Sequence, residues 1–474
     1  MRSRMLSCLG SGSLALAVGL GAVGAAGAAL GDSDFVPNQA IVRPREGVSI
    51  GVINARYGSA TLREVISRRW FLLSPPATLS EDAFVQLLLT DPDVEVAELN
   101  FVAADTEAGG GSQSIFLPRS VVSFENDPTP STMGVPDAQG MSRGAGVKVA
   151  VVDSGVDVGH PMLAGRIAAG GFNFIEQNTD VSDLPDGIDT NGNGFLDEMA
   201  GHGTFVSGLV SRVAPSAMIL PIRVLDSDGV SNAFLIAQGV YHALDEGAQV
   251  VNVSIGTQGE SLLLASLASE VEAAGVFFVA SAGNDGSSSP ARQPASLRSR
   301  GVIGVAATTL QDVRADFSNY GSWVSVSAPG VGVVSLLPGG GFGEASGTSF
   351  AAPLVSGVAA LLRSTCPAAS FEELRGQLLG TARSINAQNP SYVGQLGSGR
   401  VDAAAALGAP PNDGLLCWCD VNLSGSVEFG DIAIVLANFS RTYPAATVGP
   451  GDASRNWVVT FDDVTRVLVH LGSR

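Results

Sequence analysis

The chain contains 474 residues, of which 45% are hydrophobic, so it is long enough to form two or three domains with a large buried core. Its 45 acidic and 26 basic residues give a formal net charge of −19. Because phosphate groups are bound by basic surfaces, this charge argues against nucleic acids and anionic membranes as partners, and it favours calcium as a ligand.

The first 29 residues have the composition of a secretory signal peptide. Arg2 and Arg4 precede an apolar stretch at 14–30, which ends in small residues. No second apolar run reaches the length of a membrane span. We therefore expect a secreted or cell-surface protein without a transmembrane segment.

Residues 35–108 form the next region, in which short apolar runs alternate with amphipathic stretches. The pattern predicts a small α/β sandwich with strands near 39–43, 70–73 and 94–98 and helices near 48–57 and 80–89. A glycine-rich segment follows, and we interpret 109–125 as a linker. The pattern alone is also compatible with a plain additional domain.

Asp153 follows an almost unbroken run of β-branched residues at 147–152. Runs of this kind are typical of central strands in parallel sheets, and ligands gather at the carboxyl ends of such strands. The position of Asp153 therefore suits an acid that orients a catalytic group.

The acidic loop at 186–198 carries oxygen-bearing side chains at alternate positions, as in the first half of an EF-hand calcium loop. Ala200 stands where such a loop has its last glutamate, so Asp197 or Glu198 would have to complete the ligand shell. A solvated acidic turn is the alternative interpretation. The predicted calcium ligands are Asp189, Asn191, Asn193 and Asp197.

Only four histidines occur in the chain, and His202 lies between two glycines just before an apolar segment. The glycines keep the ring accessible, and residues 205–210 are expected to form a buried helix. His202 is therefore the best candidate for a general base. We interpret His160, His242 and His470 as structural or surface residues.

Further apolar strands and helices alternate along the chain after His202. The strands are expected at 218–225, 250–255, 276–280 and 302–306, and the helices at 232–246 and 262–274. Alternation of this kind predicts an α/β fold with a doubly wound, mainly parallel sheet.

Ser349 lies in a segment of small residues, 347–353, that leads into the apolar stretch 354–362. A helix beginning here would aim its unpaired N–H groups and its positive dipole end at the serine hydroxyl. Such an environment stabilises an oxyanion, but the serine needs a base to attack a carbonyl carbon. Asp153, His202 and Ser349 supply an acid, a base and a nucleophile in that order.

With these residues the chain resembles the subtilase family of serine proteases. The resemblance covers residues 140–408 and rests on four motifs, at 153–156, 202–204, 281–286 and 347–353. It implies a serine endopeptidase with a subtilisin-like sheet, a catalytic domain at 126–409 and protein or peptide substrates. Asn284 matches the asparagine that donates to the oxyanion in this family. Phe205 departs from the histidine that more often follows the His-Gly-Thr motif.

The resemblance also implies roles for two short segments and for the N-terminal region. Residues 254–256 match the strand that holds an extended substrate, and 281–283 match the floor of the first specificity pocket, although both could simply be packed core. Residues 35–108 resemble a family propeptide that acts as chaperone and inhibitor of its own protease. The implied substrate-binding residues are Ser254, Ile255, Gly256, Ser281, Ala282 and Gly283.

The tail, 417–474, follows a linker at 410–416 and contains two acidic loops, each before an apolar helix. The duplicated unit resembles a dockerin, a small α-helical calcium-loop domain that binds cohesin modules. The dockerin recognition positions hold Phe429 and Gly430, and Phe461 and Asp462, so the identity of a cohesin-like partner stays open. The predicted calcium ligands are Asp420, Asn422, Ser424, Ser426 and Asp431, then Asp452, Ser454, Asn456, Val458 and Asp463.

Without the leader, three cysteines remain, Cys366, Cys417 and Cys419, so at most one disulfide can form within the chain. We interpret them as structural or unpaired. The sequence as a whole indicates a secreted, self-processing serine endopeptidase that binds Ca²⁺, needs no organic cofactor and is tethered by its tail. The alternatives are a non-catalytic pseudoprotease scaffold or surface binding protein, and a tail that serves stability alone.

Overall fold

The computed structural model describes residues 34–104, 116–298 and 301–408. The predicted leader, the glycine-rich half of the predicted linker and the predicted dockerin-like tail lie outside the described residues. Within the described ranges, none of the helices is both long enough and apolar enough to cross a membrane.

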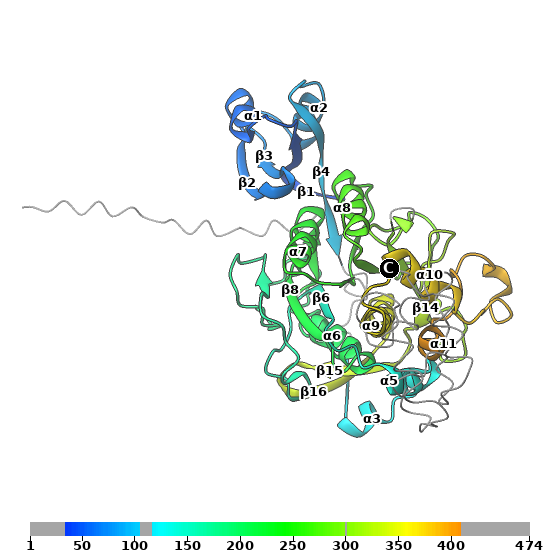
Figure 1. Ribbon diagram of the computed structural model, residues 1–474. Coiled ribbons are helices and arrows are strands. Elements are labelled where there is room, and N and C mark those ends of the chain that lie inside the picture. Colours follow the sequence, from blue (N-terminus) through cyan, green and yellow to red (C-terminus); the bar gives the residue numbers. More distant parts are fainter. Residues whose placement is uncertain (1–33, 105–115, 299–300, 409–474) are drawn as a thin grey trace, which may run out of the picture.

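The N-terminal region forms an antiparallel sheet with two helices, as Figure 1 shows in blue. The strands run in the order β4, β1, β3, β2. One strand, β2, was not predicted, because its residues alternate between exposed and half-buried and form no apolar run. The elements are β1 (Phe35–Pro44), α1 (Ile50–Tyr57), β2 (Ala60–Val65), β3 (Trp70–Ser74), α2 (Glu81–Leu89) and β4 (Val94–Ala104).

The region that carries the predicted catalytic residues, here termed the catalytic region, is built on a seven-stranded sheet in the order β14, β13, β12, β10, β6, β8, β7. Every pairing within it is parallel, which confirms the predicted subtilisin-like sheet. The strands are β6 (Lys148–Asp153), β7 (Phe172–Asn173), β8 (Met218–Arg223), β10 (Val250–Val253), β12 (Phe277–Ser281), β13 (Ile303–Thr308) and β14 (Val326–Pro329).

Helices cover both faces of this sheet, so the sheet is doubly wound. One apolar core joins the strands to α6 (His202–Val213) and α9 (Thr348–Thr365). A second core, on the opposite face, contains α7 (Ala233–Asp245) and α8 (Leu262–Ala273). The N-terminal domain lies over α7 and α8 (Figure 1).

Part of the predicted linker is ordered. Residues 117–119 form β5 (Leu117–Arg119), which pairs with β16 (Gly341–Ala345), and β16 pairs in turn with β15 (Val333–Leu337). Helix α3 (Val121–Glu125) follows β5 directly. Residues 117–125 of the predicted linker therefore belong to the fold of the region that follows, and 109–115 lie outside the described residues.

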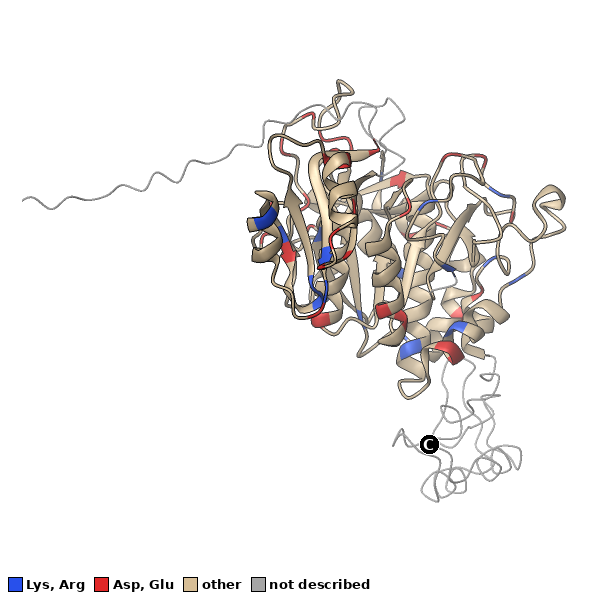
Figure 2. Cartoon of the chain, turned by 90° about the horizontal axis from the view of Figure 1, so that it is seen from above, with Lys and Arg blue, Asp and Glu red and all other residues tan. Residues whose placement is uncertain are grey.

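The remaining helices of the described catalytic region lie near the C-terminal end of α9. They are α4 (Thr129–Thr132), α5 (Val135–Met141), α10 (Phe371–Gly380) and α11 (Ala403–Gly408). Cys366, the residue after the end of α9, is buried and disulfide-bonded, so it has the structural role that the sequence left open. Figure 2 shows that basic residues are scattered over many elements of the described chain.

Candidate active site

Asp153 and His202 form a buried pair at one edge of the parallel sheet. The Oδ1 atom of Asp153 lies 2.7 Å from Nδ1 of His202, and both side chains are fully buried. Asp153 is the last residue of β6, and His202 is the first residue of α6. The structure therefore brings together the predicted acid and the predicted base, which are far apart in the sequence.

The close approach of these two segments depends on glycine. A side chain at Gly203 would collide with the carbonyl oxygen of Gly155, and one at Gly155 would lie 2.6 Å from the carbonyl oxygen of Val181. Because Gly203 has no Cβ atom, the turn after β6 can pack directly against the first turn of α6, and the lack of one at Gly155 lets the segment of Val181 approach the same turn.

Ser349 lies in the first turn of α9, whose N-cap residue Gly347 provides no side-chain hydrogen bond. The Ser349 hydroxyl donates a hydrogen bond of 3.1 Å to the carbonyl oxygen of Ser254. The Ser254 hydroxyl donates in turn to the carbonyl oxygen of Ser349. The next residue, Phe350, places its ring 5.4 Å from the His202 ring, measured between centroids. Ser349 is thus on the same edge of the sheet as the Asp153–His202 pair.

Phe205, the departure from the family pattern, packs beside the same aromatic group. Its ring lies 4.6 Å from that of Phe350. Because the Phe350 ring contacts the His202 ring, Phe205 helps to fill the apolar space beside the imidazole.

Asn284 follows β12 and is oriented by the first residue of α9. The backbone N–H and the hydroxyl of Thr348 both donate to Oδ1 of Asn284, at 2.8 and 2.9 Å. The amide N–H₂ group must therefore point away from Thr348. The Thr348 hydroxyl also accepts from the backbone N–H of Gly283, which ties the loop after β12 to the helix that carries Ser349.

Asn319 holds the same loop and was not predicted. It is fully buried, and its Oδ1 atom accepts from the backbone N–H groups of Asp285 and Ser287, while Nδ2 donates to the carbonyl of Ala282. An ion pair with Arg292 and a hydrogen bond from Asn319 hold the pKa of Asp285 below its usual value. A lone asparagine in a loop gives no sequence signal of such a role.

The six predicted substrate-binding residues lie along two adjacent strand ends. Ser254 and Ile255 follow β10, and Gly256 begins β11 (Gly256–Thr257). Ser281 ends β12, and Ala282 and Gly283 follow, with Gly283 in the left-handed region at φ 98°.

The end of β4 occupies the space beside these residues. It pairs in antiparallel fashion with β11, where Ala104 is opposite Gly256, and with β9 (Val230–Asn232), where Val102 is opposite Asn232. The N-terminal domain therefore inserts its last strand between two strands of the catalytic region.

Two polar side chains of β4 also cap helices of the catalytic region. Glu98, only 7% exposed, accepts hydrogen bonds from the Ser261 hydroxyl and from the first two N–H groups of α8, at 2.6–3.0 Å. Burial raises the pKa of Glu98, and these hydrogen bonds oppose the shift. Asn100, fully buried, accepts from the N–H of Phe234 in α7.

In the acidic loop, the predicted calcium ligands bind groups of the loop itself. Asp189 and Asp197 each accept hydrogen bonds from backbone N–H groups. Asn191 and Asn193 donate their amide groups to Glu198. Burial raises the pKa of Glu198. Among the described residues, no three or more His, Cys, Asp or Glu side chains form a group that could hold a metal ion.

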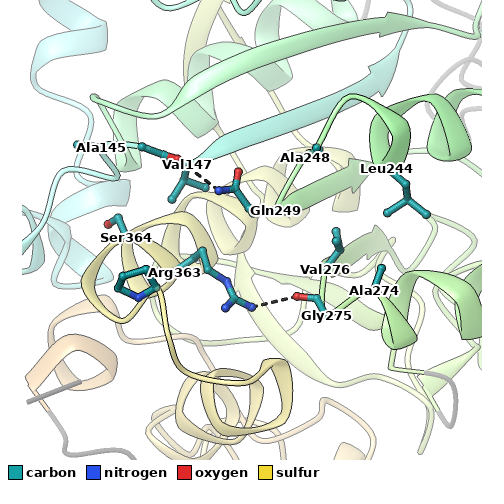
Figure 3. Close-up of a pocket in the computed structure, with 13 residues that line it drawn as sticks. Ala145, Val147, Leu244, Ala248, Gln249, Ala274, Gly275, Val276, Arg363 and Ser364 are labelled. Carbon is teal, nitrogen blue, oxygen red and sulfur yellow. Dashed lines mark hydrogen bonds between the residues drawn. The ribbon is translucent and has the colours of Figure 1, made fainter. Parts of the chain in front are cut away.

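A cavity of about 530 Å³ lies at the amino-terminal ends of the parallel strands, and neither Asp153 nor His202 lines it. Figure 3 shows the residues around it. Its walls include Val147, Gln249 and Val276, which precede β6, β10 and β12. Arg363 crosses this cavity and donates to the carbonyls of Gly275 and Ala369. Since ligands of parallel sheets gather at the carboxyl ends of the strands, we do not place the chemistry here.

Comparisons with known proteins agree with this geometry. Residues 144–403, more than half of the chain, match the sequence model of the Subtilase family. This chain belongs to the subtilase family. It is 36% identical to thermitase from Thermoactinomyces vulgaris over 59% of this chain and 94% of that protein. It is 33% identical to subtilisin E from Bacillus subtilis (strain 168), over 73% and 86% of the two chains.

Among solved structures, the fold is similar to fervidolysin from Fervidobacterium pennivorans, a keratinolytic enzyme related to subtilisin. The TM-score is 0.64 at 24% identity, and the match covers 81% of this chain but only 63% of that one. This likeness concerns the fold alone. Together with the curated relatives, the family match identifies the chain as a subtilisin-like serine endopeptidase.

Proposed function

We propose that this subtilase hydrolyses peptide bonds through Asp153, His202 and Ser349. The observation that carries the proposal is the buried 2.7 Å contact between Asp153 and His202, at the edge of the sheet where α9 presents Ser349. Asp153 would hold the imidazole with Nδ1 protonated, so that Nε2 can accept the proton of the serine hydroxyl. His202 would then return that proton to the leaving amine.

Asn284 is proposed to donate to the oxyanion together with N–H groups of the first turn of α9. Thr348 supports this role, because it occupies Oδ1 of Asn284 and so fixes which side of the amide carries the donors. Removal of one such donor costs about 2.7–4 kcal/mol of transition-state stabilisation in subtilisin. We expect a loss of similar size for Asn284→Ala.

A non-catalytic scaffold is the competing function, and a fluorophosphonate probe that modifies only an activated serine separates the two. We expect stoichiometric labelling of the mature protein and none of Ser349→Ala, whose turnover should fall about 10⁶-fold because triad residues act as a unit. Labelling of the variant, or its retention of more than about a hundredth of the activity, would show that Ser349 is not the nucleophile.

We further propose that residues 35–108 are a propeptide that assists folding and blocks the cleft until it is removed. The pairing of Ala104 with Gly256 supports this role, since the segment lies where an extended substrate is expected. β4 ends at this pair, and its direction from Ala103 to Ala104, opposite Thr257 and Gly256, leads towards Ser254, whose carbonyl accepts from the Ser349 hydroxyl. Mass spectrometry of the mature N-terminus should place self-cleavage downstream of Ala104.

Calcium binding is proposed at the acidic loop and in the tail, since related subtilisins commonly bind this ion. The loop offers Asp189, Asn191, Asn193 and Asp197, but their present hydrogen bonds would have to rearrange around an ion. In the tail, metal binding would drive folding of two acidic loops. We expect a fragment 412–474 to gain helix with calcium and to lose it in chelator; equal circular dichroism spectra would contradict the proposed tail sites.

Secretion and tethering complete the proposed function. The leader composition supports export, and the duplicated calcium loops support attachment to a cohesin-like partner. A pull-down with the full chain, with and without calcium, tests the tether. If Asp420→Ala or Asp452→Ala left capture unchanged, the tail would serve stability and not docking.

A further inference from the structure

Asp183 is a fully buried carboxylate that belongs to neither the triad nor the oxyanion site. Its side chain is 1% exposed and accepts four hydrogen bonds of 2.7–3.0 Å. One oxygen accepts from the Ser154 hydroxyl and the N–H of Gly201, and the other accepts from the N–H and the hydroxyl of Thr204.

The donors come from the two segments that carry the catalytic pair. Ser154 directly follows Asp153, and Gly201 and Thr204 flank His202 in the first turn of α6. The Ser154 hydroxyl also accepts from the N–H of Gly203, which closes the network. A single side chain from a third segment therefore connects the end of β6 to the beginning of α6.

Few hydrogen bonds hold the carboxylate of Asp153 in place. Its Oδ1 atom accepts from the N–H of Ser154 and contacts His202, and within the described part of the chain Oδ2 has no hydrogen-bond partner. The position of Ser154 thus determines where the carboxylate of Asp153 lies. In α6, the N-cap residue Gly201 has no side chain, and Asp183 takes over the capping of this helix end.

We propose that Asp183 is a positioning residue for catalysis, which fixes the separation of Asp153 and His202 through Ser154 and Thr204. The inference rests on the proposed roles of that pair. A displacement of about 1 Å in a catalytic group can reduce the rate about 100-fold, so a residue that sets this separation affects turnover more than substrate binding.

Asp183→Asn is the decisive variant, because it keeps the shape of the side chain and replaces one acceptor oxygen with an N–H₂ group. That group must face the N–H of Gly201 or of Thr204, and neither backbone donor can rotate away. With a chromogenic peptide p-nitroanilide, we expect kcat per titrated active site to fall about 10- to 100-fold while KM changes less than about threefold.

Two further comparisons keep the test independent of folding. Thr204→Val removes one donor to Asp183, together with the acceptor of the Asp157 N–H group, and should lower kcat, whereas Thr204→Ser keeps both hydrogen bonds and should restore it. Asp180→Asn removes an exposed negative charge from the same loop and should leave kcat unchanged. Active-site titration with a fluorophosphonate, below the melting temperature of each variant, corrects for unfolded protein.

The outcomes distinguish this inference from the proposed function. If the parent enzyme is active, Ser349→Ala is inactive and Asp183→Asn retains a kcat within twofold of the parent, the positioning role is overturned while the triad stands. Equal kcat values for Thr204→Val and Thr204→Ser would overturn it as well. If Ser349→Ala remains active, the proposed triad itself fails.

Discussion

The N-terminal domain and the catalytic region differ in how their sheets are covered. The seven parallel strands are covered on both faces by helices of their own region, α6 and α9 on one face and α7 and α8 on the other. The N-terminal sheet has only α1 and α2 of its own, and its other face is covered by the catalytic region. Alternate residues along β1 and β3 therefore enter two different cores.

The alternation is visible at Ala40, Ile41 and Val42. Ala40 and Val42 join Phe71 and Phe84 in the core of the N-terminal domain. Ile41 belongs to the catalytic core that also contains α7 and α8, together with Leu72 and Trp70 of β3. The second face of the N-terminal sheet is thus buried by another region, and a domain of this size is expected to be marginally stable without it.

Deletion of the N-terminal domain tests this comparison with the largest expected effect. A chain lacking residues 35–104 should fold slowly and give less than about a tenth of the active enzyme, because the parallel sheet consists of long-range pairings. Residues 35–108 added in trans should restore folding and inhibit the mature enzyme. Full activity from the deleted chain, measured by active-site titration, would show that the domain is not a propeptide.

Trp70 and Phe84 belong to different cores, so substitutions at these positions test the two faces of the N-terminal sheet separately. Trp70 lies in the core shared with α7 and α8, and Phe84 of α2 lies in the core of the N-terminal domain itself. Both are fully buried, and replacement of such a residue by alanine costs about 3–5 kcal/mol. Trp70→Ala should weaken inhibition in trans by about 100-fold or more and leave the circular dichroism of the isolated domain unchanged. Phe84→Ala should reduce that circular dichroism. Equal effects of both substitutions on the isolated domain would contradict the division into two cores.

The sequence predicted the parallel sheet and the Asp153–His202 pair better than the contact between the regions. Parallel strands covered on both faces appear as apolar runs, and the residues of the proposed triad lie in short motifs. In contrast, β2 has no apolar run, and the pairing of Ala104 with Gly256 joins segments that no local pattern connects. Asp183 was missed for a related reason, since one aspartate among many carries no signal until the fold surrounds it with donors.

Glu98 tests the polar part of the contact. Glu98→Ala would leave three donors at the start of α8 without an acceptor, at a cost of about 1–3 kcal/mol, which corresponds to a roughly 10- to 100-fold weaker inhibition in trans. Glu95→Ala is the matched control, because Glu95 is an exposed residue of the same strand and forms its ion pairs with Arg43 and Arg69 of the N-terminal domain itself. An inhibition constant for Glu98→Ala equal to that of the control would show that capping of α8 contributes nothing.

A substitution in the acidic loop should have the smallest effect on stability. It tests whether the catalytic region is stable without a bound ion. Both oxygens of Asp189 accept backbone N–H groups, so Asp189→Ala removes two bonds that shape the loop and also removes a proposed calcium ligand. If calcium binds there, it should raise the melting temperature of the parent by a few degrees, since ligands that bind only the folded state stabilise it.

The variant separates the two roles of Asp189 because each role changes a different quantity. Loss of the loop hydrogen bonds lowers the melting temperature in chelator, whereas loss of an ion ligand reduces the increase that calcium produces. The comparison requires a chain ending at residue 408, so that the proposed calcium ligands of the tail cannot contribute. An equal calcium response in the parent and in Asp189→Ala would mean that the loop is a solvated acidic turn, stabilised by its own backbone and amide hydrogen bonds.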